Sequence, residues 1–103
     1  MIKCIISKNT IKISGHANYD LYGKDIVCAS VSSIVTTVVN IIMNIDERAI
    51  SYQDDGNVIT ITKLNDNSII QNILDTMISM LKDLEIQYNK NIKIESEEWK
   101  CYI

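Results

Sequence analysis

The sequence has no phenylalanine and no proline, and it has only one tryptophan and one histidine. Without phenylalanine, a core must be built from aliphatic side chains, and the hydrophobic content of 47% is large enough to supply one. Basic residues do not gather in a run, and the net charge is −3, which argues against an extended nucleic-acid surface and favours a basic partner. A length of 103 residues predicts a single globular domain, residues 1–103.

Cysteines are few and widely spaced. Cys4, Cys28 and Cys101 form an odd set without close pairs, and the N-terminus lacks a signal-peptide pattern, so we expect a reduced protein in the cytoplasm. A zinc site made from these three and His16 stays open as an alternative, but zinc sites usually use closely spaced ligand pairs. We therefore expect neither a metal nor a cofactor.

The longest apolar stretch, 25–45, is interrupted by polar residues at helical spacing. The polar stripe consists of Ser30, Ser33, Thr37, Asn40 and Asn44. This pattern predicts an amphipathic helix that does not span a membrane, with Asp25 as its N-cap. The predicted core-facing residues are Val27, Val31, Ile34, Val35, Val38, Ile42 and Ile45.

The remaining elements follow from alternating apolar residues and turn signals. We predict strands at 1–7, 11–14, 48–53, 58–64 and 91–95, and a second helix from Ile69 to about Tyr88, capped within 66–68. The predicted inner face of that helix is Ile70, Ile73, Leu74, Met77, Leu81 and Leu84. The order β-β-α-β-β-α-β indicates an α+β domain with two helices packed on a largely antiparallel sheet. One sheet face would stay uncovered, which suggests a homodimer.

The candidate catalytic residues lie in the segment 15–32. Cys28 falls in the first helical turn, where the helix N-terminus favours a thiolate. Asp25 and Ser32 lie three residues before and four after it, on the same helical strip. His16 lies on the preceding loop, and a cysteine with a nearby imidazole is the minimal device for thiol-based acyl transfer. On these residues alone, Cys28 as a packing residue and Asp25 as a plain cap remain open.

A family resemblance adds to this reading. Three motifs and one serine carry it: Gly15-His16-Ala17, Tyr22-Gly23, Asp25-Ile26-Val27-Cys28-Ala29 and Ser32. Together they resemble the signature of the ribosomal-processing cysteine proteases, the Prp family. The resemblance covers most of the chain but leaves out the tail, 95–103. It implies a catalytic dyad of His16 and Cys28, supported by Gly15, Asp25 and Ser32.

The resemblance also implies a reaction. The enzyme would remove the N-terminal extension of large-subunit ribosomal protein twenty-seven, with Cys28 as nucleophile and His16 as base and then acid. Backbone N–H groups at the front of the helix would bind the oxyanion. The loop with Tyr19, Tyr22 and Gly23 is expected to close over the bound substrate. The alternative for this loop is that its two tyrosines only cover an edge of the core. The alternative function is a non-catalytic module that binds a ribosomal protein or assembly intermediate. Neither nucleic acid nor membrane is an expected partner.

Overall fold

The computed structural model describes residues 1–21 and 23–97. The elements are β1 (Ile2–Ile6), β2 (Thr10–Ser14), α1 (Ile26–Ile45), β3 (Ile50–Asp54), β4 (Val58–Lys63), α2 (Ser68–Gln87) and β5 (Ile92–Ser96). The predicted order and the α+β class are confirmed. The third strand begins at Ile50 rather than at residue 48, because Asp46 caps the end of α1 and its carboxylate accepts a hydrogen bond from the Arg48 backbone N–H at 2.9 Å.

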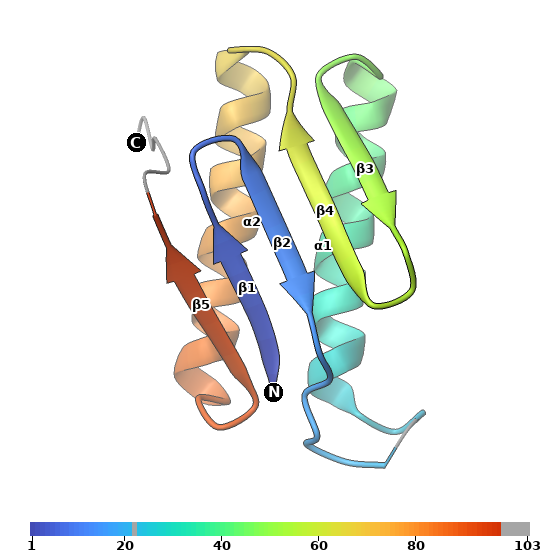
Figure 1. Ribbon diagram of the computed structural model, residues 1–103, viewed down its shortest axis with the longest axis vertical. Coiled ribbons are helices and arrows are strands. Elements are labelled where there is room, and N and C mark those ends of the chain that lie inside the picture. The colour runs from blue at the N-terminus through green and yellow to red at the C-terminus, as the bar shows by residue number, and fades with distance from the viewer. Residues whose placement is uncertain (22, 98–103) are drawn as a thin grey trace.

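The five strands form one sheet in the order β3-β4-β2-β1-β5. Three pairings are antiparallel, and only β1 and β5 run parallel. Both helices lie behind the sheet on the same face (Figure 1). The end of β2, the start of α1 and the β3–β4 turn meet at one end of the molecule, at the bottom of Figure 1. The segment 15–32, which holds the candidate catalytic residues, joins β2 to α1 at this end.

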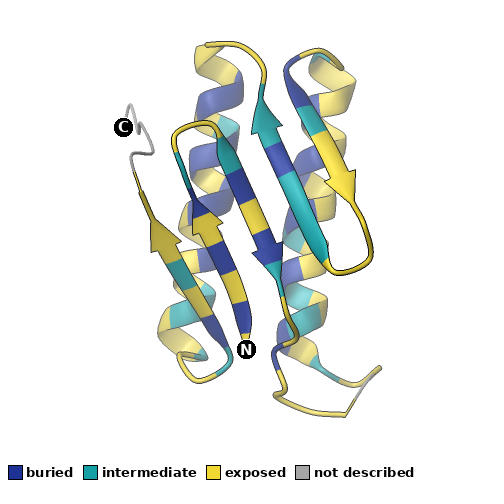
Figure 2. Ribbon diagram, viewed as in Figure 1, coloured by how far each residue is buried: buried dark blue, intermediate teal, exposed yellow. Residues whose placement is uncertain are grey.

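Burial alternates along the central strands, as a sheet covered on one face requires (Figure 2). In β1, Ile2, Cys4 and Ile6 are buried, whereas Lys3 and Ile5 are exposed. The uncovered face is polar, and exposed lysines lie on it in three adjacent strands: Lys3, Lys12 and Lys93. The predicted open sheet face therefore exists, but it is not an apolar surface.

Both helices pack with their predicted faces. The buried residues of α1 are Val27, Val31, Val35, Val38, Val39 and Ile42, and the apolar ones of α2 are Ile70, Leu74, Met77, Ile78 and Leu81. The prediction for Ile45 is wrong, since it is 53% exposed at the last residue of α1.

By length and composition alone α1 could span a membrane, and about a third of it is buried inside the molecule. The core helix of a globular protein passes the same test.

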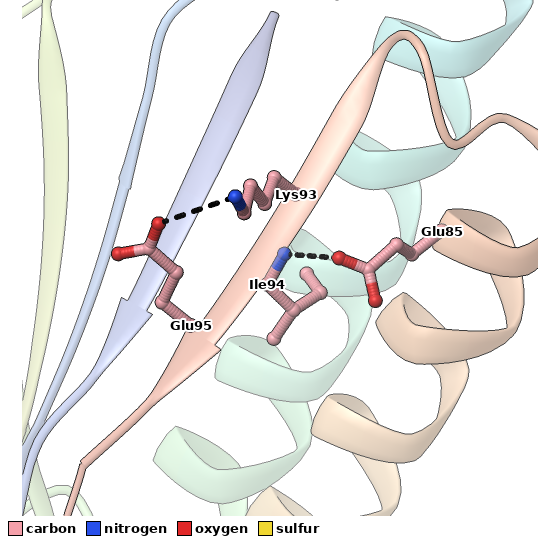
Figure 3. Close-up of polar contacts among 4 residues, drawn as sticks. All are labelled: Glu85, Lys93, Ile94 and Glu95. Carbon is pink, nitrogen blue, oxygen red and sulfur yellow. Dashed lines mark hydrogen bonds and ion pairs between the residues drawn. The ribbon is translucent and has the colours of Figure 1, made fainter.

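The edge strand β5 is tied to α2 by a carboxylate. Glu85 of α2 accepts a hydrogen bond from the backbone N–H of Ile94 at 2.6 Å (Figure 3). On the strand itself, Lys93 and Glu95 form an exposed ion pair at 3.9 Å. The Ile94 N–H already has an acceptor, and β5 carries charged side chains. Both features discourage another strand from adding to this edge of the sheet.

Candidate active site

The site begins where β2 ends. Gly15 follows Ser14 with φ of +85°, and a Cβ atom built on it would collide with the backbone carbonyl oxygen of Met1. Only glycine meets both requirements without strain, because it lacks the Cβ and accepts positive φ. The chain therefore leaves the sheet tightly against the start of β1, and the next residue, His16, is exposed.

Asp25 joins the loop to the helix. Its Oδ1 accepts hydrogen bonds from the backbone N–H groups of Val27 (2.9 Å) and Cys28 (3.0 Å), as the N-cap prediction requires. Its Oδ2 accepts from the loop, from Tyr19 (2.9 Å) and Asp20 (3.3 Å). Partial desolvation acts to raise the pKa of Asp25, but the four N–H donors outweigh it and hold this pKa below its ordinary value. A single ionised carboxylate thus fixes the loop relative to α1.

Cys28 is half-buried, and its sulfur is held from the loop side. The backbone N–H of Ala17 donates to Cys28 Sγ at 3.3 Å. Cys4 is the other described cysteine, and both are free thiols. Burial, with a smaller contribution from Glu85, raises the pKa of Cys4 to about 12, so it stays protonated in the core. Of the two, Cys28 alone is placed for reaction.

Two grooves meet at this cysteine. The hairpin-side groove, about 520 Å³, runs from β2 and α1 to the β3–β4 turn. Its apolar lining comes from Ile2, Ile13, Val31, Val35 and Ile59, and its turn side from Tyr52, Asp54, Gly56 and Asn57. The loop-side groove, about 670 Å³, is lined by Asn18, Asp20, Gly23, Asp25 and Ala29. His16, Cys28 and Ser32 line both grooves. An extended chain crossing from one groove to the other would pass over these three side chains.

The structure corrects one predicted role. Backbone N–H groups at the front of α1 were expected to bind an oxyanion, but those of Val27 and Cys28 already donate to the Asp25 carboxylate. The Ala29 N–H donates to the Asp25 carbonyl oxygen at 3.0 Å. The N–H that faces the sulfur instead comes from the loop, at Ala17. Sequence reasoning missed this donor, since a backbone N–H in a loop leaves no residue-type signal.

The predicted substrate loop is only partly at the grooves. Gly23 lines the loop-side groove, while the ring of Tyr19 packs edge-on against Tyr88, with centroids 5.3 Å apart. Tyr22 lies outside the described residues. Among residues 1–21 and 23–97, no three His, Cys, Asp or Glu side chains are grouped so that they could hold a metal ion. Cys101, part of the zinc alternative, also lies outside them.

A free, half-buried cysteine in the first turn of a helix shares two open grooves with a histidine, and these are the residue types that thiol-based peptide hydrolysis uses. Comparison with known proteins agrees, since a model of the family described as cysteine protease Prp matches residues 1–93. The chain belongs to this family of ribosomal-processing cysteine proteases.

Its relatives include solved structures. The chain is 39% identical over 85 residues to the ribosomal processing cysteine protease Prp of Staphylococcus aureus strain NCTC 8325, covering 80% of each chain. A crystal structure of S. aureus Prp with a covalently linked product peptide superposes with a TM-score of 0.84 at 32% identity, over 93% of this chain and 99% of that one. A second, with a substrate peptide, has a TM-score of 0.82 and 28% identity over the same shares.

Proposed function

We propose that Cys28 is the nucleophile of this cysteine protease and that His16 is its general base and acid. The observation that carries the proposal is that both side chains line both grooves, so a peptide lying across them would present its backbone to this pair. His16 takes the proton from Cys28 Sγ, and the thiolate attacks the scissile carbonyl carbon. The C–N bond breaks, His16 protonates the leaving amine, and water hydrolyses the resulting thioester.

The substrate we propose is the N-terminal extension of large-subunit ribosomal protein twenty-seven. Two observations support a peptide of this kind. The S. aureus relatives were solved with a substrate peptide and with a covalently linked product peptide. In addition, each groove contains an acidic side chain that is exposed, Asp54 on the hairpin side and Asp20 on the loop side. Together with the net charge of −3, they favour a basic chain such as a ribosomal protein.

The supporting residues have separate roles in this proposal. Gly15 allows the tight exit from β2 that presents His16, and Asp25 fixes the loop to α1. Ser32 is exposed in both grooves one helical turn after Cys28, so its hydroxyl contacts the bound peptide. Neither nucleic acid nor a membrane is a partner in this scheme. We place the enzyme in the cytoplasm, since processing of a ribosomal protein belongs where ribosomes are assembled.

The proposal includes a homodimer formed through the helices rather than the open sheet face. Helix α1 has no charged residue over its twenty positions. Between α1 and α2 lies a solvent-facing groove of about 380 Å³ with an almost wholly apolar lining, centred on Ile34, Ile41, Ile73 and Met80. A second copy would cover this groove with its own, as a two-fold interface requires. The sheet face instead carries three lysines, which would repel their counterparts.

The test of the activity uses a synthetic peptide spanning the ribosomal-protein extension and its junction. Wild-type protein, Cys28→Ala and His16→Ala are incubated with it in parallel, and products are identified by mass spectrometry. We expect one cut with wild type, no detectable cut with Cys28→Ala, and a rate reduced by at least about 100-fold with His16→Ala.

Ser30→Ala is the matched control, since Ser30 lies on α1 with its hydroxyl bonded to the Ile26 carbonyl oxygen at 2.7 Å, outside the lining of both grooves. It should cut at the wild-type rate. Cleavage that survives Cys28→Ala would contradict the proposed nucleophile. An intact peptide in the wild-type reaction would contradict this substrate.

A further inference from the structure

The loop residue that faces the sulfur is held at both ends. Ala17 is 1% exposed, and its N–H donates to Cys28 Sγ at 3.3 Å. Its carbonyl oxygen accepts a hydrogen bond from the side-chain amide of Asn91, at 3.0 Å. A carbonyl oxygen only accepts, so the Asn91 amide must face it with its NH₂ group. The partner is 74 residues away in sequence, in the turn between α2 and β5.

Asn91 is itself well fixed. Its backbone N–H donates to the Tyr88 carbonyl oxygen at 2.8 Å, and its own carbonyl oxygen accepts from the Ile2 N–H at 2.9 Å. The ring of Tyr88, from the same turn, packs against Tyr19. The α2–β5 turn therefore contacts the loop at Ala17 and Tyr19, while Asp25 accepts hydrogen bonds from the backbone N–H groups of Tyr19 and Asp20.

This arrangement matters for the sulfur, because a thiolate is stabilised by N–H donors directed at it. The N–H groups of Val27 and Cys28 at the front of α1 are bonded to Asp25, so they are not available for the sulfur. The Ala17 N–H is the donor that contacts the sulfur in the part of the chain the structure describes, and its direction depends on how the Ala17 backbone is held. Asn91 is not among the described residues that line the two grooves, so it does not contact a peptide there.

We propose that Asn91 is a positioning residue of the site: its amide orients the Ala17 backbone so that the Ala17 N–H faces Cys28 Sγ, and this contact raises the reactivity of the sulfur. This inference rests on the proposed function, in which Cys28 is the nucleophile. Asn91 then affects the chemical step rather than substrate binding.

The experiment measures alkylation of Cys28 by iodoacetamide as a function of pH, in a Cys101→Ser background and without substrate. Cys4 is buried with its pKa raised to about 12, and peptide mapping separates its signal from that of Cys28. For Asn91→Ala and Asn91→Asp we expect Cys28 to react about fivefold more slowly near neutral pH, the factor that one hydrogen bond corresponds to. Asn91→Asp keeps the shape of the side chain but turns an oxygen towards the Ala17 carbonyl.

The control is Asn89→Ala, an exposed position in the same turn, which should react as wild type does. Urea unfolding of every variant measures stability separately. A purely structural role for Asn91 would loosen the loop and leave alkylation of Cys28 unchanged or make it faster, and that result would overturn the proposal. A slower reaction in both Asn91 variants, but not in Asn89→Ala, supports it.

The peptide assay separates the two proposals. Asn91→Ala should lower kcat about fivefold and leave KM within twofold of wild type. If wild type does not cut the peptide but alkylation slows as expected, the substrate assignment fails and the role of Asn91 stands. If wild type cuts the peptide and the Asn91 variants match wild type in both alkylation and kcat, the role of Asn91 fails alone.

Discussion

At the scale of single residues, the site depends on contacts with backbone groups. Asp25 accepts four backbone hydrogen bonds, and Asn91 holds the residue that faces the sulfur. Gly15 acts by having no side chain at all. The segment that carries His16 and Cys28 is therefore held by residues to which the proposed mechanism gives no chemical step.

Gly15 gives the sharpest prediction at this scale. Gly15→Ala would combine positive φ with a collision against the Met1 carbonyl oxygen, so β1 or the loop must shift. We expect the free energy of unfolding to fall by about 3 kcal/mol and peptidase activity to fall with it. Gly56→Ala is the matched control, since Gly56 has φ of +90° but open space around its Cβ position, and it should cost only about 1 kcal/mol.

Urea denaturation of both variants gives the comparison, with peptide cleavage measured on the same preparations. Equal losses of stability would show that the contact with Met1 has no effect and that backbone strain alone matters. Wild-type cleavage by Gly15→Ala would show that the tight exit from β2 is not needed at the site.

At the scale of elements, tertiary contacts override weak local preferences. Helix α1 is rich in β-branched residues, which form helices poorly in isolation, and its buried side chains pack on the sheet to stabilise it. Helix α2 buries two polar residues, Gln71 and Asp75, which the amphipathic pattern did not indicate. Lys63 donates to Gln71 Oε1 at 2.6 Å, and the Gln71 side-chain amide donates to Asp75 Oδ1 at 2.9 Å, so a chain of hydrogen bonds links β4 to α2.

The Glu85 contact with β5 gives a prediction about an element. Glu85→Ala leaves the Ile94 N–H at the sheet edge without this acceptor, and we expect the free energy of unfolding to fall by about 1–2 kcal/mol. Glu85→Gln keeps an acceptor oxygen and should lose less. Glu95→Gln is the control, because its ion pair with Lys93 is exposed and should contribute under about 0.5 kcal/mol.

Urea unfolding measures all three variants, and light scattering reports aggregation. Similar small losses for Glu85→Ala and Glu95→Gln would mean that the edge contact does not stabilise β5. If only Glu85→Ala aggregates, the Glu85 carboxylate also prevents other chains from pairing with the edge strand β5.

At the scale of the whole molecule, one face carries the helices, the other face is an open polar sheet, and the site lies at one end (Figure 1). The proposed dimer through the helices leaves both grooves of the site accessible. None of the residues that line the apolar groove between the helices also lines a groove of the site. They are Ser33, Ile34, Thr37, Val38, Ile41, Ile73, Thr76 and Met80.

Sedimentation equilibrium tests this arrangement. We expect wild type to be a dimer at micromolar concentration and Ile41→Glu or Met80→Glu to be monomeric, because a charge would be buried in the apolar groove. Ile5→Glu, on the open sheet face, should stay dimeric. Dissociation by Ile5→Glu alone would move the interface to the sheet, and a monomeric wild type would contradict the dimer altogether.

Much of this protein follows from local sequence patterns. Apolar periodicity predicted both helices and all five strands, since a helix and a strand each repeat at a fixed interval along the chain. The cap at Asp25 follows from a side chain that bonds to nearby backbone N–H groups. The segment 15–32 was recognisable because it combines several residue types at a spacing that resembles the Prp signature.

Only the tertiary structure decided how distant parts meet. Nothing near β1 in sequence indicates that it pairs in parallel with β5, and that pairing brings the turn with Asn91 beside the loop at Ala17. The collision that requires Gly15 comes from the backbone of Met1, and the donor to the sulfur is a backbone N–H. Backbone groups are the same in every residue, so their positions depend on the folded chain and carry no mark in the sequence.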